Sequence, residues 1–158
     1  MVSDRYMVLQ NQVWAMLKES PYHINITHLD GVAILCAFIG LKRGLKVEIC
    51  RCSGLLHDLW LYCRFPINGT KELKKQHGYN GSDLAKELLI ENGGYSCEEL
   101  KIICEAIYNH NDKELVHDGY SEALKDADAF WHYLNSSDYD KSYNYYGRDK
   151  KLLDEFMI

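Results

Sequence analysis

Four of the seven histidines lie in segments with a helical pattern. Each of them is separated from apolar residues by three, four or seven positions. Such spacings place side chains on one face of a helix, so each imidazole is expected to point inward. Helices of a bundle meet along their inward faces, and the four imidazoles can therefore converge near one end of a bundle. The four residues are His28, His57, His77 and His110.

A carboxylate directly follows one of these histidines, in the pair His57-Asp58. Neighbouring helical residues point about 100° apart, so the pair can flank one metal, or Asp58 can bridge two. Imidazole and carboxylate ligands suit Zn, Fe and Mn. A single inward histidine is usually a core residue, whereas four of them beside a carboxylate indicate a metal site.

A further carboxylate is available near the C-terminal end of the pattern. Ala127 and Phe130 belong to an apolar face that Asp126 and Asp128 flank symmetrically. Helical periodicity alone leaves open which aspartate turns toward the histidines.

The elements that must position these groups are predicted to be helices. The chain has two prolines in 158 residues and a strong 3.6-residue periodicity, which favours an all-α fold. We expect a single-domain helical bundle of six to eight helices. Ser96 and Glu99 form a capping box that opens one of them. The predicted helices cover residues 5–18, 27–43, 47–61, 71–92, 96–109, 121–134 and 149–157.

The bulk properties restrict the partners. Lys and Arg number 18 against 23 Asp and Glu, a net charge of −5, which disfavours a nucleic-acid surface. A small phosphorylated substrate is still compatible, because a metal supplies positive charge locally. The longest apolar run, residues 31–41, is too short to span a bilayer, and the N-terminus has no signal-peptide core. We expect a cytoplasmic protein without membrane contact, as a monomer or homodimer.

Five segments of the sequence resemble the HD superfamily of metal-dependent phosphohydrolases over residues 22–134. We expect residues 135–158 of the same single domain to form a C-terminal flap and helix. The pattern of six candidate ligands, four histidines and two aspartates, is similar to that of the binuclear branches of the superfamily. These branches include the diadenosine tetraphosphate hydrolases and the HD-GYP cyclic-dinucleotide phosphodiesterases. The segments are His28-Leu-Asp-Gly-Val32, Gly54-Leu-Leu-His57-Asp58, His77-Gly-Tyr-Asn-Gly81, Ala106-Ile-Tyr-Asn-His110 and Asp126-Ala-Asp-Ala129.

The resemblance implies two metals, one of which has Asp128 as its last ligand, because the family's alanine-aspartate step matches Ala127-Asp128. Asp126 is the alternative last ligand. It also implies that Asp58 bridges the metals and that His57 and Asp58 are catalytic. We expect one or two divalent transition metals to be bound, Fe, Mn or Zn, with Mg or Ni also possible. The implied ligands of the first metal are His28, His57, Asp58 and Asp128, and those of the second are Asp58, His77 and His110.

The sequence departs from the HD-GYP pattern at two places. Leu59 follows the His-Asp pair where that pattern has lysine, and Asn111 follows His110 where it has a second histidine. We therefore expect hydrolysis of a nucleotide or dinucleoside polyphosphate through a metal-activated water, rather than of a cyclic dinucleotide. The alternative is a non-catalytic HD-fold module for ligand binding or signalling. Candidate phosphate contacts are Arg51, Arg64 and Lys113.

Overall fold

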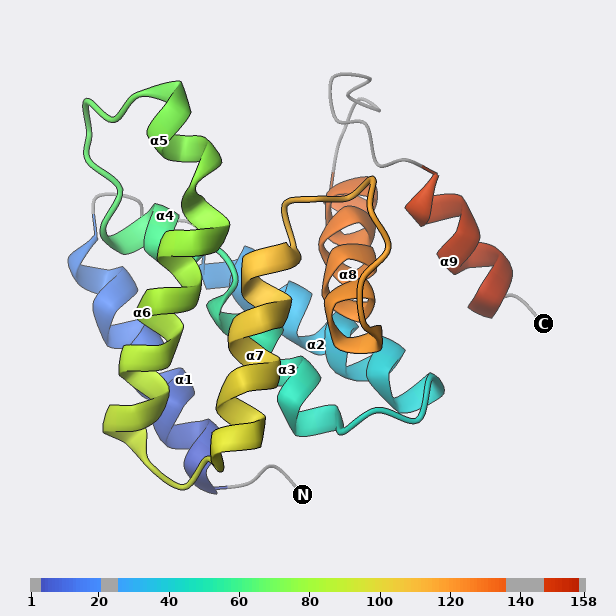
Figure 1. Ribbon diagram of the computed structural model, residues 1–158, viewed down its shortest axis with the longest axis horizontal. Coiled ribbons are helices and arrows are strands. Elements are labelled where there is room, and N and C mark those ends of the chain that lie inside the picture. Colours follow the sequence, from blue (N-terminus) through green and yellow to red (C-terminus); the bar gives the residue numbers. More distant parts are fainter. Residues whose placement is uncertain (1–3, 21–25, 136–146, 157–158) are drawn as a thin grey trace.

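The computed structural model describes residues 4–20, 26–135 and 147–156, and within these ranges the regular structure is helical throughout (Figure 1). The predicted all-α class is confirmed. The helices are α1 (Asp4–Glu19), α2 (Ile26–Lys42), α3 (Val47–Leu56), α4 (Leu59–Cys63), α5 (Lys71–Lys75), α6 (His77–Asn92), α7 (Cys97–Asn109), α8 (Gly119–Asn135) and α9 (Arg148–Phe156).

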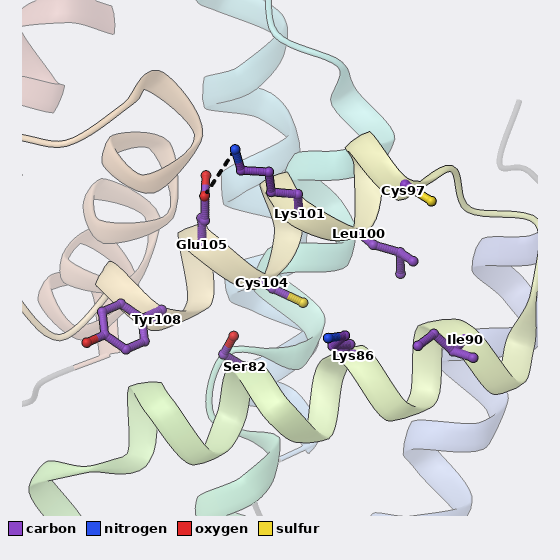
Figure 2. A pocket seen from close by; sticks show the side chains of 9 residues that line it. All are labelled: Ser82, Lys86, Ile90, Cys97, Leu100, Lys101, Cys104, Glu105 and Tyr108. Carbon is purple, nitrogen blue, oxygen red and sulfur yellow. Dashed lines mark ion pairs between the residues drawn. The ribbon is translucent and has the colours of Figure 1, made fainter.

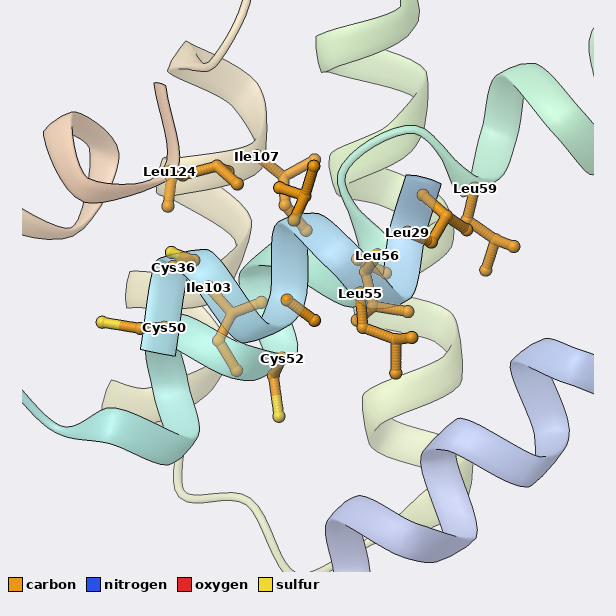
Figure 3. Close-up of a cluster of buried hydrophobic side chains, with 14 of the residues drawn as sticks. Leu29, Cys36, Cys50, Cys52, Leu55, Leu56, Leu59, Ile103, Ile107 and Leu124 are labelled. Carbon is orange, nitrogen blue, oxygen red and sulfur yellow. The ribbon is translucent and has the colours of Figure 1, made fainter. Parts of the chain in front are cut away.

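Helix α3 lies at the centre of the bundle, in contact with α1, α2, α7 and α8. Helices α6 and α7 run side by side along one flank, and α8 lies between α2 and α9 on the other (Figure 1). The core contains apolar side chains from most of the helices, and those from α2, α3, α7 and α8 include Leu29, Leu55, Ile107 and Leu124 (Figure 3). Burial of these side chains supplies the main driving force for folding.

Helices α2 and α3 approach each other closely at Gly54. A Cβ atom added there would lie 2.6 Å from the Cα of Ala33 and 2.8 Å from its backbone nitrogen. Only glycine fits, because real Cβ atoms do not come that close to a backbone. The contact places the end of α3, and therefore His57, against α2.

Two helices predicted as continuous are each divided in the structure, so the prediction was wrong at both points. The predicted helix 47–61 breaks at the His-Asp pair, where Asp58 has φ −109° and ψ 7°. The predicted helix 71–92 breaks at Gln76, with φ −88° and ψ 8°. Apolar periodicity continues across both breaks, which is why it did not reveal them. Elsewhere the predicted capping box of Ser96 and Glu99 is confirmed at the start of α7.

Ion pairs and aromatic contacts hold α9 against α8 and α2. Arg148 pairs with Glu122 at 2.9 Å and with Asp126 at 2.7 Å, and Phe156 stacks on Phe38 with ring centroids 5.2 Å apart. Most of the expected flap, residues 136–146, lies outside the described residues. No helix in the described part of the chain has the length and apolar character needed to cross a membrane.

Candidate metal centre

Five segments of the bundle bring histidine and aspartate side chains to one place. His28 lies in the first turn of α2, the His-Asp pair fills the break between α3 and α4, and His77 begins α6. His110 caps the end of α7, and Asp128 lies on α8. The break after Leu56 matters here, because His57 keeps a helical backbone while Asp58 leaves it, with φ −109° and ψ 7°, and both side chains turn toward the same centre.

Asp58 directs its two carboxylate oxygens to different pairs of histidines. Oδ2 lies 3.6 Å from Nε2 of His28 and 3.5 Å from Nε2 of His57. Oδ1 lies 3.3 Å from Nε2 of both His77 and His110. The carboxylate therefore stands between two groups of imidazoles and belongs to both.

Asp128 on α8 completes the first of these groups. Its Oδ1 lies 3.7 Å from Nε2 of both His28 and His57, and these two nitrogens lie 3.2 Å from each other. Its other oxygen, Oδ2, accepts a hydrogen bond from Nζ of Lys113 at 2.7 Å. One oxygen of Asp128 thus faces the imidazoles while the other is held by an ammonium group.

Backbone carbonyl groups orient three of the imidazoles. In each case Nδ1 bonds the carbonyl oxygen of the residue three positions earlier, so Nδ1 carries the hydrogen. Nε2 is then left with a lone pair that points into the centre, which is the arrangement of metal-binding histidines. The Nδ1–O distances are 2.8 Å for His57, 2.7 Å for His77 and 2.5 Å for His110.

The donor atoms fit a metal in their spacing and in their lack of hydrogen-bond partners. Oδ1 of Asp58 and Oδ1 of Asp128 are buried without a hydrogen-bond partner, a costly state unless a cation lies nearby. A metal about 2.1 Å from two ligands in tetrahedral or octahedral positions holds them about 3.0–3.4 Å apart, close to the distances seen here. Among the described residues, three groups have ligand atoms within 4.8 Å of one another: His28, His57 and Asp58; His28, Asp128 and His132; and Asp58, His77 and His110.

The charges of the cluster also suit a cation. Burial by itself raises the pKa of Asp58, but the neighbouring imidazoles, His57 first, outweigh burial and hold that pKa well below its usual range. Burial lowers the pKa of His110 to about 4, with help from His57 and His77. Burial also lowers the pKa of His57, but Asp58 and Asp128 outweigh it and raise that pKa. A proton and a metal therefore compete for Nε2 of His57.

Asp126, the alternative last ligand, is engaged elsewhere. Its Oδ2 lies 2.7 Å from Nη2 of Arg43, and its Oδ1 lies 2.7 Å from Nη1 of Arg148. Both oxygens are thus used in ion pairs that connect α8 to Arg43, just after α2, and to α9. Of the two aspartates that the sequence left open, the structure brings Asp128 to the histidines.

The three predicted phosphate contacts have different surroundings. Lys113 lies beside the cluster, bonded to Asp128. The guanidinium of Arg51 instead lies over the ring of Tyr6, 4.2 Å from its centroid. Arg64 pairs with Glu87 at 2.9 Å, where both side chains are about half exposed. Neither arginine is brought to the cluster by these contacts.

One residue that sequence reasoning missed also belongs to the cluster. Nε2 of His132 lies 3.4 Å from Oδ1 of Asp128, and its ring centroid lies 5.2 Å from that of His28. The signal was present in the sequence, because a residue four positions after Asp128 lies on the same face of a helix.

A groove of about 590 Å³ lies between α6 and α7, away from the cluster (Figure 2). Its walls are mainly apolar, with Ile90 and Leu100 at one end and Tyr108 at the other, and Lys101 pairs with Glu105 on its α7 side. None of the clustered histidines and aspartates lines it. The chemistry-bearing groups and this groove are therefore separate features.

Comparison with known proteins identifies the family. The sequence model of the HD domain matches residues 25–131, a range that contains His28, His57, Asp58, His110 and Asp128. No curated protein and no solved structure gives a match to the chain. The matched range covers more than half of the chain, and the protein therefore belongs to the HD-domain family.

Proposed function

We propose that the protein is a metal-dependent phosphohydrolase that acts on a small phosphorylated molecule, either a nucleotide or a dinucleoside polyphosphate. The observation that carries the proposal is the position of Asp58. Its Oδ2 faces His28 and His57 while its Oδ1 faces His77 and His110. A single metal does not need a carboxylate whose two oxygens face different pairs of histidines. A carboxylate that bridges two metals has this arrangement.

The proposed ligands form two sets, which we call the first and second metal positions. They share only Asp58, through different oxygens. The first metal position consists of His28, His57, Asp58 and Asp128. The second consists of Asp58, His77 and His110. Fe, Mn and Zn suit both sets, because the donors are imidazole nitrogens and carboxylate oxygens.

When bound, two divalent metals would polarise a phosphate and lower the pKa of a water molecule, the chemistry that phosphate ester or anhydride hydrolysis needs. The protein's own part is positioning. The i−3 carbonyl groups hold the imidazoles in one tautomer, and Asp58 keeps the two sets at a fixed separation. These groups are held in place before substrate binds, which lowers the reorganisation that the reaction requires.

Lys113 is the proposed phosphate contact from the protein. Its ammonium group has three N–H donors, of which one bonds the carbonyl oxygen of His110 at 3.1 Å and another bonds Asp128 at 2.7 Å. A phosphate oxygen can accept the third. The side chain is 16% exposed, so it lies at the border between the cluster and solvent.

The test is metal analysis of protein purified without chelator, followed by assays of phosphate release. The substrate panel consists of nucleoside phosphates and dinucleoside polyphosphates, with Mn²⁺ or Fe²⁺ added. Turnover that requires the metal supports the proposal. A protein with metals bound and no turnover of any substrate would instead indicate the non-catalytic ligand-binding module, and a protein that binds no metal would exclude the site.

A further inference from the structure

We propose that His132 is a fifth protein ligand of the first metal position, which makes the two positions unequal in how tightly they hold a metal. This inference rests on the binuclear site of the proposed function. It adds a ligand that the resemblance to the HD superfamily does not supply, and it concerns which of the two metals exchanges.

The geometry around Asp128 carries the inference. Oδ1 of Asp128 is buried without a hydrogen-bond partner, and three imidazole nitrogens surround it. Nε2 of His132 is the nearest at 3.4 Å, and Nε2 of His28 and of His57 each lie at 3.7 Å. Ligand atoms of His28, Asp128 and His132 lie within 4.8 Å of one another, a spacing at which one cation can contact all three.

The backbone fixes His132 in this position. It lies one helical turn after Asp128 on α8, so both side chains leave the helix on the same face. The adjacent Trp131 packs into the space left by Gly31 on α2, where any Cβ atom would overlap the indole ring. The Trp131 ring also lies edge-on to His28, with centroids 6.2 Å apart. This contact holds the last turns of α8 beside the start of α2.

The extra ligand changes the balance between the two positions. With His132, the first metal position has three nitrogen and two oxygen donors, so a six-coordinate metal there keeps one place for water or substrate. The second metal position has three protein donors and keeps three places. A metal with more protein ligands leaves more slowly, so the first metal is expected to be retained and the second to exchange.

Metal release measures this difference without reference to activity. The protein is loaded with Co²⁺, mixed with excess EDTA, and the loss of bound Co²⁺ is followed by absorbance. Wild type should release the metal in two phases. His132→Ala should speed the slow phase at least about 10-fold, since loss of a group that merely supports a ligand already has that effect. His77→Ala should alter the fast phase instead.

Two further variants test whether His132 binds the metal itself or only supports a ligand. His132→Gln keeps a hydrogen-bond donor for Asp128 but has no imidazole, so it should release metal as fast as His132→Ala. His117→Ala removes an imidazole that bonds Lys125 rather than the cluster, and it should behave like wild type. A slow phase unchanged in His132→Ala, or restored in His132→Gln, would overturn the inference while leaving two metals in place. A wild type that binds no Co²⁺ would overturn the proposed function itself.

Discussion

Asp58 and His110 face each other with 3.3 Å between Oδ1 and Nε2, although both atoms present lone pairs. Nδ1 of His110 donates to the carbonyl oxygen of Ile107, and the low pKa of His110, about 4, keeps the imidazole neutral near pH 7. Two lone pairs at this distance in a buried site repel each other unless a cation lies between them. The fold therefore holds in place a contact that is favourable only with a metal bound.

Replacement of Asp58 should empty both metal positions together. Asp58→Ala removes the one carboxylate that faces both sets of histidines, and metal content should fall from two equivalents toward zero along with phosphate release. The fold should survive, because Asp58 precedes α4 without a side-chain capping bond. Metal analysis after dialysis and far-UV circular dichroism check the two parts. Loss of only one equivalent would show that Asp58 does not bridge.

Metal should stabilise the folded chain. A ligand that binds only the native state at about 100 times its Kd adds about 2.7 kcal/mol to the free energy of unfolding. For a chain of this length that raises Tm by about 5–10 °C per site. Thermal unfolding with EDTA and then with Mn²⁺ measures the difference. Asp58→Asn serves as the control, and an equal rise in that variant would mean that Mn²⁺ binds elsewhere.

Local spacing in the sequence predicts which histidines point inward, whereas it does not predict the breaks in the helices that carry them. The inward phase of His28, His77 and His110 follows from spacing alone, since it needs only local periodicity. The choice between Asp126 and Asp128 does not, because the two flank one apolar face equally. The ion pairs of Asp126 with Arg43 and Arg148 involve residues distant in sequence, and no local pattern encodes them.

The break at His57-Asp58 was missed for a related reason. It is set by how the end of α3 meets neighbouring helices, and Gly81 of α6 lies so close that an added Cβ would be 3.1 Å from the carbonyl oxygen of His57. Arg51 shows the same limit, because its position over Tyr6 depends on how α1 packs against α3. His132, by contrast, could have been found from its spacing to Asp128.

Gly54→Ala should destabilise the protein, because the new methyl group would meet the backbone of α2 rather than a movable side chain. Overpacking of this kind costs about 2 kcal/mol or more. Urea denaturation measures the change. Gly119→Ala is the matched control, since its Cβ would meet only Leu45 at 3.4 Å, and it should be neutral or slightly stabilising. Equal effects of the two substitutions would contradict the close approach of α2 and α3.

Lys113→Met should weaken substrate binding while both metals remain bound. It removes a charged donor proposed to contact phosphate, and such hydrogen bonds contribute about 1.5–3 kcal/mol, so KM should rise roughly 10-fold or more. The control is Lys101→Met, whose ammonium group lies on the surface with 72% of the side chain exposed. Steady-state kinetics and metal analysis are measured in parallel. An unchanged KM with full metal content would remove Lys113 from the phosphate site.

A buried group of charges next to the cluster should make the free energy of unfolding depend on pH in the acid range. Lys125 is fully buried, and its ammonium group bonds Oε1 of Glu122 and the carbonyl oxygen of Leu115, both at 2.9 Å. Arg148 reaches the other oxygen of Glu122 at 2.9 Å and the carbonyl oxygen of Lys113 at 3.1 Å. Glu122 thus connects α8, α9 and the segment that carries Lys113.

Burial raises the pKa of Glu122, but Lys125, the backbone N–H of His117 and Arg148 outweigh it and lower that pKa to about 2. A carboxyl group with a depressed pKa contributes stability above its unfolded pKa of about 4.3 and loses it as the pH falls toward the folded value. Glu122→Gln should therefore be least stable relative to wild type above about pH 5, and the difference should narrow steadily toward pH 2. Urea denaturation in EDTA at several pH values measures it, with Glu105→Gln as a surface control, since Glu105 is 55% exposed beside Lys101. A difference between wild type and Glu122→Gln that stays constant over this range would mean that Glu122 acts through packing rather than charge.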